Sequence, residues 1–536
     1  MLTSDCRIED ATSSEAMTFS AFCGAIAGLQ RGACCGHGGV LAAVVSPPDR
    51  HDGAFKRLGF DAWRDRVRSR EPRVPTVDGT YLLPDVTVLP RYDAARPHVD
   101  VEVRDGRIGR IQPTGTMSDP PRRVLTAHRG AWVSAALADL HVHFPPDNVL
   151  RLTDLFLLQT LRHGVAMVRD AGDTDGTATP AVLTRLLSGE LPGPEVQYAY
   201  GFVNAPPARW HNAFDYRHPS QAAAIVARLR FLGASWVKSY ENLDRPRIAA
   251  LESAAAAAGL GVLGHVPYGL GHEDALLADS QHLIGIVDPR RLERDHILDR
   301  LTDWRSVDQA RLDVVRRASV QHRLALTPTL SATAALLELE RYEAACEERT
   351  AAALPQFYSR IVWHPKHGIP AYRGMTTETF DRIRSAMEWK QRLIHQLHDD
   401  GVELRLGTDT QQPFVAPGVS LHHEIAAFVE AGLPRRVVLD IASRRAAGVL
   451  SVTDGGEVRE GWRADLLVSS QDPGSADWTP ERHLDAVVTR GRLVTTADLD
   501  AAIARELGRF EGAVMSHATR WVARFTMHRL ARAFVG

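Results

Sequence analysis

Two histidines one residue apart, His141 and His143, lie in the otherwise apolar stretch ADLHVHF (138–144). If this stretch is a strand, its side chains alternate between faces, so both imidazoles point the same way. Burying two imidazoles side by side is unfavourable unless another group pairs with them. A metal ion is such a group, because imidazole nitrogen is a common ligand of zinc and related ions. The pair therefore indicates a metal site.

Four further polar residues end or adjoin short apolar runs later in the chain. Lys238 lies in GASWVKSYENL, His265 in GLGVLGHVPYG, His282 in DSQHLIG and Asp409 in LRLGTDT. Four imidazoles and one carboxylate at one place would suit zinc or another divalent first-row metal. Lys238 fits this set if carbon dioxide converts its amine to a bridging carbamate, which a desolvated lysine with a lowered pKa favours.

The residues come from a central region in which short apolar runs alternate with helical patterns. Eight runs predict a parallel (β/α)8 barrel. The runs are 135–142, 165–172, 196–203, 234–240, 260–266, 281–287, 324–330 and 402–409. Active sites of such barrels lie where the strands end. Insertions before the last run, including HPKHGIPAYRG (364–374) and a helical stretch at 376–401, are expected to roof the pocket.

Alternating apolar and polar residues on both sides of this region predict short strands. We expect residues 79–130 and 451–500 to form one composite β-sandwich domain, with the barrel spanning 131–450. Residues 1–78 form an N-terminal extension whose order the sequence leaves open, and residues 501–536 form a C-terminal helical segment.

Composition narrows the class of partner. The chain of 536 residues has a formal net charge of −2 and is 44% hydrophobic, which gives no electrostatic reason to propose nucleic acid or an anionic membrane. Five cysteines do not make a disulfide framework, and no apolar run is long enough to span a membrane. We expect a cytoplasmic protein that acts on a small molecule without stable membrane association, and a homo-oligomer is left open.

The ordered set HxH, Lys, His, His and Asp resembles the amidohydrolase superfamily. The flanking sequences are similar to its imidazolonepropionase-like and Xaa-Pro dipeptidase-like branch; they are ADLHVHF, HGVAMVRDAGD, GASWVK, GLGVLGHV, ALTPTL and GTDT. The segments HEIAAFVEAGLPRRVVLDIASRRAAGVL and GGEVREGWRADLLVSSQDP resemble the same branch. The resemblance covers roughly residues 80–495.

This resemblance implies a role for each member of the set. The HxH pair and Asp409 would hold a first metal, His265 and His282 a second, and carboxylated Lys238 would bridge the two. A hydroxide activated by the metals would be the nucleophile. Asp409 would take its proton and deliver it to the leaving group. One or two ions per chain, most simply Zn²⁺, would then be the cofactor.

The sequence departs from the family pattern at two places. AALAD (135–139) replaces the usual PGLID before the first motif, and Gln281 precedes His282 where an acidic or small apolar residue is commoner. Related branches lack the lysine and work with one metal. The sequence therefore predicts a bound metal more firmly than it predicts whether one or two ions bind.

Two residues on the strands are candidates for contact with substrate. Tyr240 lies two residues beyond Lys238 on the same face, where it would hydrogen-bond a substrate carbonyl or oxyanion or simply pack. Arg169 in MVRDAG would bind an anionic group of the substrate, or form a salt bridge with Asp170 or Asp173, which we favour.

Three residues on connecting segments are further candidates for the pocket wall. Trp210 and His211 lie on the loop after the third run, and His422 lies in SLHHE after the eighth. Polar residues at a helix start would explain His422 equally well.

The main hypothesis is a metal-dependent amidohydrolase that cleaves an amide-like C–N bond, within or outside a peptide, in a dipeptide, an N-acyl amino acid or a cyclic amide. The first alternative is a metal-dependent lyase, decarboxylase or cyclase of specialised metabolism, since the fold and ligands are shared across such reactions. A non-catalytic barrel scaffold is the second alternative, and it conflicts with the complete set of ligands.

Overall fold

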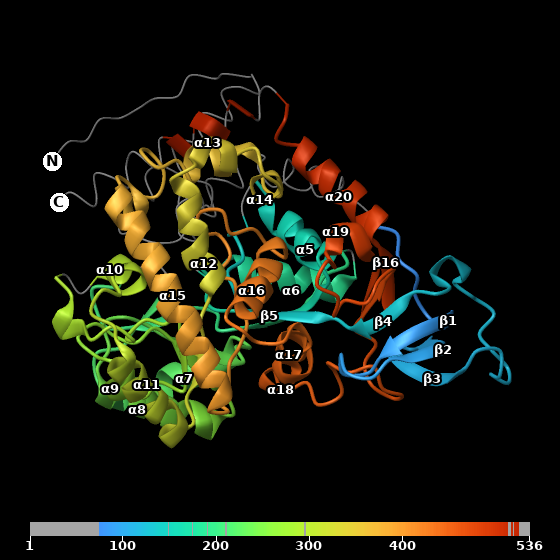
Figure 1. Ribbon diagram of the computed structural model, residues 1–536, viewed down its shortest axis with the longest axis horizontal. Coiled ribbons are helices and arrows are strands. Elements are labelled where there is room, and N and C mark those ends of the chain that lie inside the picture. The colour runs from blue at the N-terminus through green and yellow to red at the C-terminus, as the bar shows by residue number, and fades with distance from the viewer. Residues whose placement is uncertain are drawn as a thin grey trace, which may run out of the picture.

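A computed structural model of the chain contains a β-rich region at one end and a larger α/β region beside it (Figure 1). The structure describes residues 74–524, apart from 148–149, 174, 190, 209–211, 294–295, 513–515, 518 and 522. The predicted N-terminal extension therefore lies almost wholly outside the described residues, as does part of the C-terminal helical segment. Within the described part of the chain, no helix is long and apolar enough to cross a membrane.

The β-rich region is a seven-stranded mixed sheet in the order β16-β15-β14-β4-β1-β2-β3. Its strands are β1 (Tyr81–Leu89), β2 (Arg96–Arg104), β3 (Arg107–Pro113), β4 (Trp132–Ala135), β14 (Leu466–Ser469), β15 (Leu484–Thr489) and β16 (Arg492–Thr495). β14 pairs with β4, so strands from both sides of the central region share one sheet. The sandwich form and the domain boundaries stay predictions.

The turn between β2 and β3 shows how the sequence shapes this sheet. Asp105 and Gly106 both have positive φ (50° and 81°), a conformation that glycine adopts without steric cost and aspartate tolerates. This tight turn folds β3 back along β2. The Ile108 N–H donates to the Trp462 carbonyl (2.8 Å), so β3 also contacts the segment that leads into β14.

The α/β region contains two parallel sheets. One has three strands in the order β5-β6-β7: β5 (Leu137–Val142), β6 (Val165–Asp170) and β7 (Glu195–Tyr198). The other has six strands in the order β13-β12-β11-β10-β8-β9: β8 (Phe202–Asn204), β9 (Ala213–Asp215), β10 (Trp236–Ser239), β11 (Gly261–Gly264), β12 (Asp279–Gln281) and β13 (Ala325–Thr327). The strands lead into helices, as alternating β and α patterns predict.

Backbone hydrogen bonds join the two parallel sheets at both edges. At one edge, the Ser235 N–H donates to the Tyr198 carbonyl (3.0 Å), which links the approach to β10 with β7. At the other edge, residues 403–408 run between the sheets and bond β13 at Leu326 and β5 at Leu140. The two sheets are therefore parts of one continuous hydrogen-bonded system.

Helices cover the parallel sheets, and α15 runs across one side of the α/β region (Figure 1). The helices are α5 (Leu152–Arg162), α6 (Ala178–Ser188), α7 (Ala222–Phe231), α8 (Arg245–Ala258), α9 (His272–Ala275), α10 (Ile297–Thr302), α11 (Gln309–His322), α12 (Leu330–Ala335), α13 (Tyr342–Ala345), α14 (Arg349–Ala352), α15 (Thr377–Asp399), α16 (Val419–Glu430), α17 (Arg435–Asp440), α18 (Ala446–Val449), α19 (Pro480–His483) and α20 (Thr496–Gly508). The Thr376 side chain accepts from the Thr379 N–H and caps α15 where the sequence predicts a helix start.

Three of the eight predicted strands differ in the structure. The third is divided into β7 and β8. The sixth, β12, ends at Gln281 instead of beginning there, because His282 and Leu283 take positive φ (63° and 56°) and break the extended chain. The eighth run, 402–409, forms one isolated bridge at Leu404 instead of a regular strand. The apolar pattern locates these strands but does not reveal the turn that ends β12.

Candidate metal centre

The HxH pair and Asp409 meet at the carboxyl end of β5. The Nε2 atoms of His141 and His143 lie 3.3 Å apart, and each lies 3.3 Å from Asp409 Oδ1. His141 is fully buried, and His143 and Asp409 are largely buried. Two imidazole nitrogens and one carboxylate oxygen therefore face a common point.

A buried aspartate holds these two segments together. Asp139 accepts hydrogen bonds from the Thr408 hydroxyl (2.7 Å) and from the backbone N–H groups of Thr408 and His141 (both 3.1 Å). The Asp409 N–H donates to the His141 carbonyl (2.8 Å). A Cβ on Gly407 would lie 2.5 Å from the Cβ of His141, so glycine is required for this close approach.

His282 extends the cluster from β12. Its ring centroid lies 4.6 Å from that of His141, and its Nδ1 lies 3.8 Å from Asp409 Oδ2. Thr329 Oγ1 lies 2.8 Å from the same nitrogen and orients the ring. One ligand atom each from His141, His282 and Asp409 lie within 4.8 Å of one another, which is a spacing that could hold a metal ion.

His265 lies on the far side of His282, with their ring centroids 4.8 Å apart. Its Nδ1 donates to Glu241 Oε1 (3.2 Å), and the Tyr268 hydroxyl donates to Glu241 Oε2 (3.0 Å). A carboxylate on Nδ1 fixes the ring orientation and makes Nε2 the nitrogen that would bind a metal, the arrangement found behind many metal-binding histidines.

Lys238 lies on β10, in the six-stranded parallel sheet. It is 1% exposed, and its Nζ donates to Gln281 Oε1 on β12. Burial lowers the pKa of the ammonium to about 7, although the Asp409 carboxylate opposes this shift. A substantial fraction of the amine is therefore neutral near pH 7, and the neutral amine is its nucleophilic form.

The protonation states of the cluster favour binding of a cation. Burial holds the pKa of His141 and His282 well below the usual range of histidine, so both rings are neutral and can offer lone pairs. Burial alone would raise the pKa of the Asp409 carboxyl, but the facing histidines hold it well below its usual range. The centre thus presents neutral imidazoles and one negative charge.

The spacing of the first three ligands fits a metal ion. Ligands about 2.0–2.1 Å from a tetrahedral zinc ion lie about 3.3 Å from one another. The two Nε2 atoms and Asp409 Oδ1 have these separations. His143 Nδ1 donates to the Gly172 carbonyl (2.9 Å), which fixes the tautomer that leaves Nε2 as a ligand atom. The donor set is therefore suitable for zinc.

Tyr240 lies beside the histidines. Its ring centroid is 4.6 Å from that of His265 and 5.1 Å from that of Phe202, and its side chain is almost fully buried. The position is compatible with contact to substrate, and that role stays a prediction.

Arg169 is placed elsewhere. It is fully buried in β6, where its guanidinium donates to the Leu140 carbonyl (2.7 Å) and to Asp279 Oδ2 (2.7 Å), and lies 4.5 Å from the Trp236 ring. The salt bridge favoured from the sequence exists, but with Asp279 instead of a neighbouring aspartate. These contacts hold the Arg169 guanidinium in the protein interior, which is consistent with a structural role.

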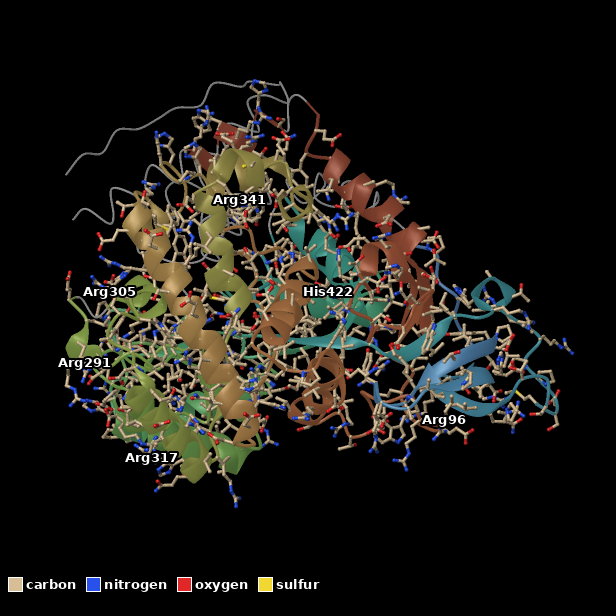
Figure 2. The ribbon with its side chains drawn as sticks, in the orientation of Figure 1. Arg96, Arg291, Arg305, Arg317, Arg341 and His422 are labelled. Atoms are coloured by element: carbon tan, nitrogen blue, oxygen red, sulfur yellow. The ribbon has the colours of Figure 1, made fainter. Side chains whose placement is uncertain are left out.

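His422 does not join the cluster. Figure 2 labels His422, which lies on α16. Its Nε2 donates to the His163 carbonyl (2.8 Å), and its ring lies 5.8 Å from that of Trp478. The helix turns this residue towards α5 and α19 instead of the strand ends, which a sequence pattern at a helix start does not reveal. Trp210 and His211 lie outside the described residues.

The insertion before the last run contacts the loop that follows Asp409. The Tyr372 hydroxyl donates to Gln412 Oε1 (2.7 Å), and the rings of Trp363 and Phe414 lie 5.0 Å apart. The insertion thus packs next to the metal centre, where the sequence places a roof.

Three positioning residues escape the sequence reasoning. Asp139 joins the two ligand segments, Glu241 supports His265, and Thr329 orients His282. Glu241 directly follows Tyr240, and Thr329 lies within the TPTL segment, so the sequence indicates that both stand at strand ends. It does not indicate which residues they contact, because each contact joins different strands.

Residues 132–494 match the sequence profile of the amidohydrolase family. The match covers more than half of the chain, and the chain belongs to this family. The protein is therefore an enzyme that acts on carbon–nitrogen bonds. No curated protein matches the sequence.

Several solved structures have a similar fold. A bottromycin amidohydrolase is 24% identical, with a TM-score of 0.62 over 82% of this chain and 91% of that chain. An Xaa-Pro dipeptidase with bound methionine is 18% identical, with a TM-score of 0.55 over 78% of this chain and 100% of that chain. An ochratoxinase from A. niger is 14% identical, with a TM-score of 0.55 over 78% and 96%. At these identities the likeness concerns the fold.

Proposed function

We propose that the protein is a metal-dependent hydrolase that cleaves an amide-like C–N bond in a small molecule. The observation that carries this proposal is the meeting of two histidine nitrogens and one carboxylate oxygen, from His141, His143 and Asp409, at mutual distances of 3.3 Å. This spacing matches the edge of a zinc tetrahedron, and the family supplies the class of reaction.

We infer that the parallel strands form a single (β/α)8 barrel. Eight segments follow one another through hydrogen bonds: β5, β6, β7 continued by β8, β10, β11, β12, β13 and residues 403–408. The last segment bonds the first, which is what closure requires. The proposed ligands then lie at the carboxyl end, where barrel enzymes carry their active sites.

The ligands divide into two groups around Lys238. His141, His143 and Asp409 would hold one ion, and His265 and His282 a second. Carboxylated Lys238 would offer one carbamate oxygen to each ion. Its full burial and low pKa favour the neutral amine that carboxylation needs. We take Zn²⁺ as the native metal, because the set combines imidazole nitrogen with carboxylate oxygen.

A divalent ion in this site would polarise the scissile carbonyl and lower the pKa of a water molecule towards neutrality. Asp409 would accept the proton of the attacking water, since its Oδ1 faces the centre and its low pKa keeps it ionised. It would then donate that proton to the leaving nitrogen. Tyr240 would donate a hydrogen bond to the carbonyl oxygen as negative charge develops there.

Dipeptides, N-acyl amino acids and cyclic amides are the proposed substrate classes. The names of two similar structures, an Xaa-Pro dipeptidase and a bottromycin amidohydrolase, support amides over other substrates. Another similar structure is a prolidase complexed with N-methylphosphonate-L-proline. Members of these classes should therefore be screened first.

Reaction in H₂¹⁸O tests the proposal directly. The zinc-loaded protein is incubated with a panel of dipeptides, N-acyl amino acids and cyclic amides, and products are analysed by mass spectrometry. Hydrolysis places one ¹⁸O in the carboxyl product, and the His143→Ala variant should lose both activity and bound metal. A product formed without ¹⁸O, as a lyase, decarboxylase or cyclase would give, contradicts hydrolysis. Full metal retention in the variant contradicts the proposed ligand set.

A further inference from the structure

Gln281 is one of the two places at which the sequence departs from the family pattern, and the structure places it against Lys238. It ends β12 with its side chain fully buried, and its Oε1 accepts from Lys238 Nζ across the intervening strand β11. The following residue, His282, belongs to the metal cluster. The Gln281 amide is thus adjacent in sequence to His282, a proposed ligand of the second metal.

The other atom of this amide lacks an acceptor. Gln281 Nε2 is buried and makes no hydrogen bond within the described residues. Leaving a buried amide donor unsatisfied is costly, typically about 1–3 kcal/mol. Such groups are uncommon in native structures, and each calls for an explanation such as a catalytic role or a bound group. An acceptor near Lys238 is therefore expected in the working enzyme.

We propose that Gln281 is a positioning residue that holds carboxylated Lys238 by donating a hydrogen bond from Nε2 to a carbamate oxygen. This inference rests on the proposed function, in which Lys238 carries a carbamate. In carboxylation, the Lys238 nitrogen attacks the carbon of carbon dioxide and a new N–C bond forms. One C=O electron pair moves to oxygen, and the nitrogen releases a proton to water.

An amide suits both states of Lys238. The free amine offers hydrogens, which Gln281 Oε1 accepts. The carbamate offers oxygens, and rotation of the amide by about 180° brings Nε2 to the same place, since the two ends of a glutamine amide are nearly identical in shape. A glutamate at this position could only accept while ionised, and it would place negative charge beside the carbamate. Gln281 is therefore compatible with carboxylation in a way that an ionised glutamate is not.

The test compares the Gln281→Met and Gln281→Glu variants with the unaltered protein. Each is equilibrated with ¹³C-labelled bicarbonate and zinc, and the carbamate carbon is measured by ¹³C NMR alongside zinc per chain and Tm. Loss of a hydrogen bond to a charged group should lower the carboxylation equilibrium by about tenfold or more in both variants. Lys390→Met, which removes another buried lysine, should leave the carbamate signal unchanged.

The unaltered protein and the two Gln281 variants distinguish failure of the Gln281 inference from failure of the proposed binuclear centre. Carbamate in the unaltered protein with an equal signal in both folded variants overturns the role of Gln281 and leaves the binuclear proposal standing. A signal maintained or increased in Gln281→Glu alone shows that the residue acts only as an acceptor, which also overturns it. Absence of carbamate from the zinc-loaded, unaltered protein overturns the Gln281 inference together with the bridged centre. Loss in both variants, with Tm retained, supports it.

Discussion

Two lysines are fully buried in the part of the chain that the structure describes, and their surroundings differ. Lys238 is 1% exposed and Lys390, on α15, is 0% exposed. Burial lowers the pKa of each to about 7. Lys390 Nζ donates to Thr333 Oγ1 (2.8 Å) and lies 5.4 Å from the centre of the Trp304 ring. Lys238 instead donates to Gln281, whose neighbour in the chain, His282, belongs to the candidate metal cluster.

The carboxylates near the two lysines also differ. Glu424, which attracts Lys390, accepts hydrogen bonds from the N–H groups of Leu330 (3.0 Å) and Ser331 (2.6 Å) and so fixes the start of α12. Asp409, which attracts Lys238, faces two imidazole nitrogens. A buried lysine with a low pKa is therefore not by itself a reactive group. Ligand atoms converging on one point distinguish the Lys238 region.

The largest effect should come from Asp409→Asn. The amide keeps the shape of the side chain but removes the negative charge and the proton acceptor, so kcat/KM should fall by about 10²–10⁴-fold. Steady-state kinetics on the best amide substrate, with zinc analysis of the same sample, measures this. If activity stays within a factor of a few, the Asp409 carboxylate does not distinguish the Lys238 region from the Lys390 region.

Replacing each lysine in turn compares the two regions directly. Lys238→Met should reduce bound metal from two ions to one or fewer and lower kcat by about 10²-fold, because the bridging ligand is lost. Lys390→Met should retain the full metal content, since no ligand atom of the centre contacts it. Elemental analysis after dialysis gives both counts. Equal metal content in the two variants would remove the functional difference between these lysines.

Substitution of two buried glutamates, Glu241 and Glu424, should change different measured properties. Glu241→Gln weakens the hydrogen bond that orients His265, so metal affinity should fall by about 10–100-fold. Glu424→Gln loses one acceptor for the N–H groups of α12, so unfolding free energy should fall by about 1–3 kcal/mol while metal stoichiometry stays unchanged. Zinc titration with a competing chelator and urea unfolding measure the two effects. Lower metal affinity in Glu424→Gln with unchanged affinity in Glu241→Gln would contradict the assignment of Glu241 to the metal site and of Glu424 to the stability of the fold.

The smallest effect concerns stability and pH. Because the pKa of Lys390 falls from 10.5 to about 7 on folding, the folded state binds fewer protons than the unfolded state between these values. Unfolding free energy therefore rises with pH in this window, by up to about 1.4 kcal/mol per pH unit. Lys390→Met lacks this dependence, so its unfolding free energy relative to the unaltered protein should fall by about 1–3 kcal/mol between pH 7 and pH 9. Urea unfolding at pH 7 and pH 9 measures this change; a constant difference between the two proteins would contradict it.

The ligand types and their order could be predicted from the sequence, because parallel strands bring their carboxyl ends to one edge. His141 and His143 lie at the carboxyl end of β5, and Asp409 ends an apolar run that forms one isolated bridge; all three are visible as the last residues of apolar runs. His282 lies in the candidate cluster. The strand predicted to begin at Gln281 is wrong, since the chain turns at His282 instead of entering a strand there.

Contacts between strands that are far apart in the sequence could not be predicted. Arg169 pairs with Asp279, 110 residues away, and no local pattern links the two. The direction of His422 depends on the rotation of α16 about its axis, which its contacts with α5 and α19 reveal. The pairing of Gln281 with Lys238 likewise requires β10 and β12 to flank β11.

The mixed sheet has a consequence for how the chain is made. β4 ends at Ala135, but its neighbour β14 begins at Leu466, about 330 residues later. At a synthesis rate of about 5–20 residues per second, one edge of the early strands stays unpaired for tens of seconds while the catalytic region emerges from the ribosome. Such an edge can pair with other chains. Expression at low temperature or with chaperones should therefore favour soluble protein, and chains that terminate before residue 466 should aggregate.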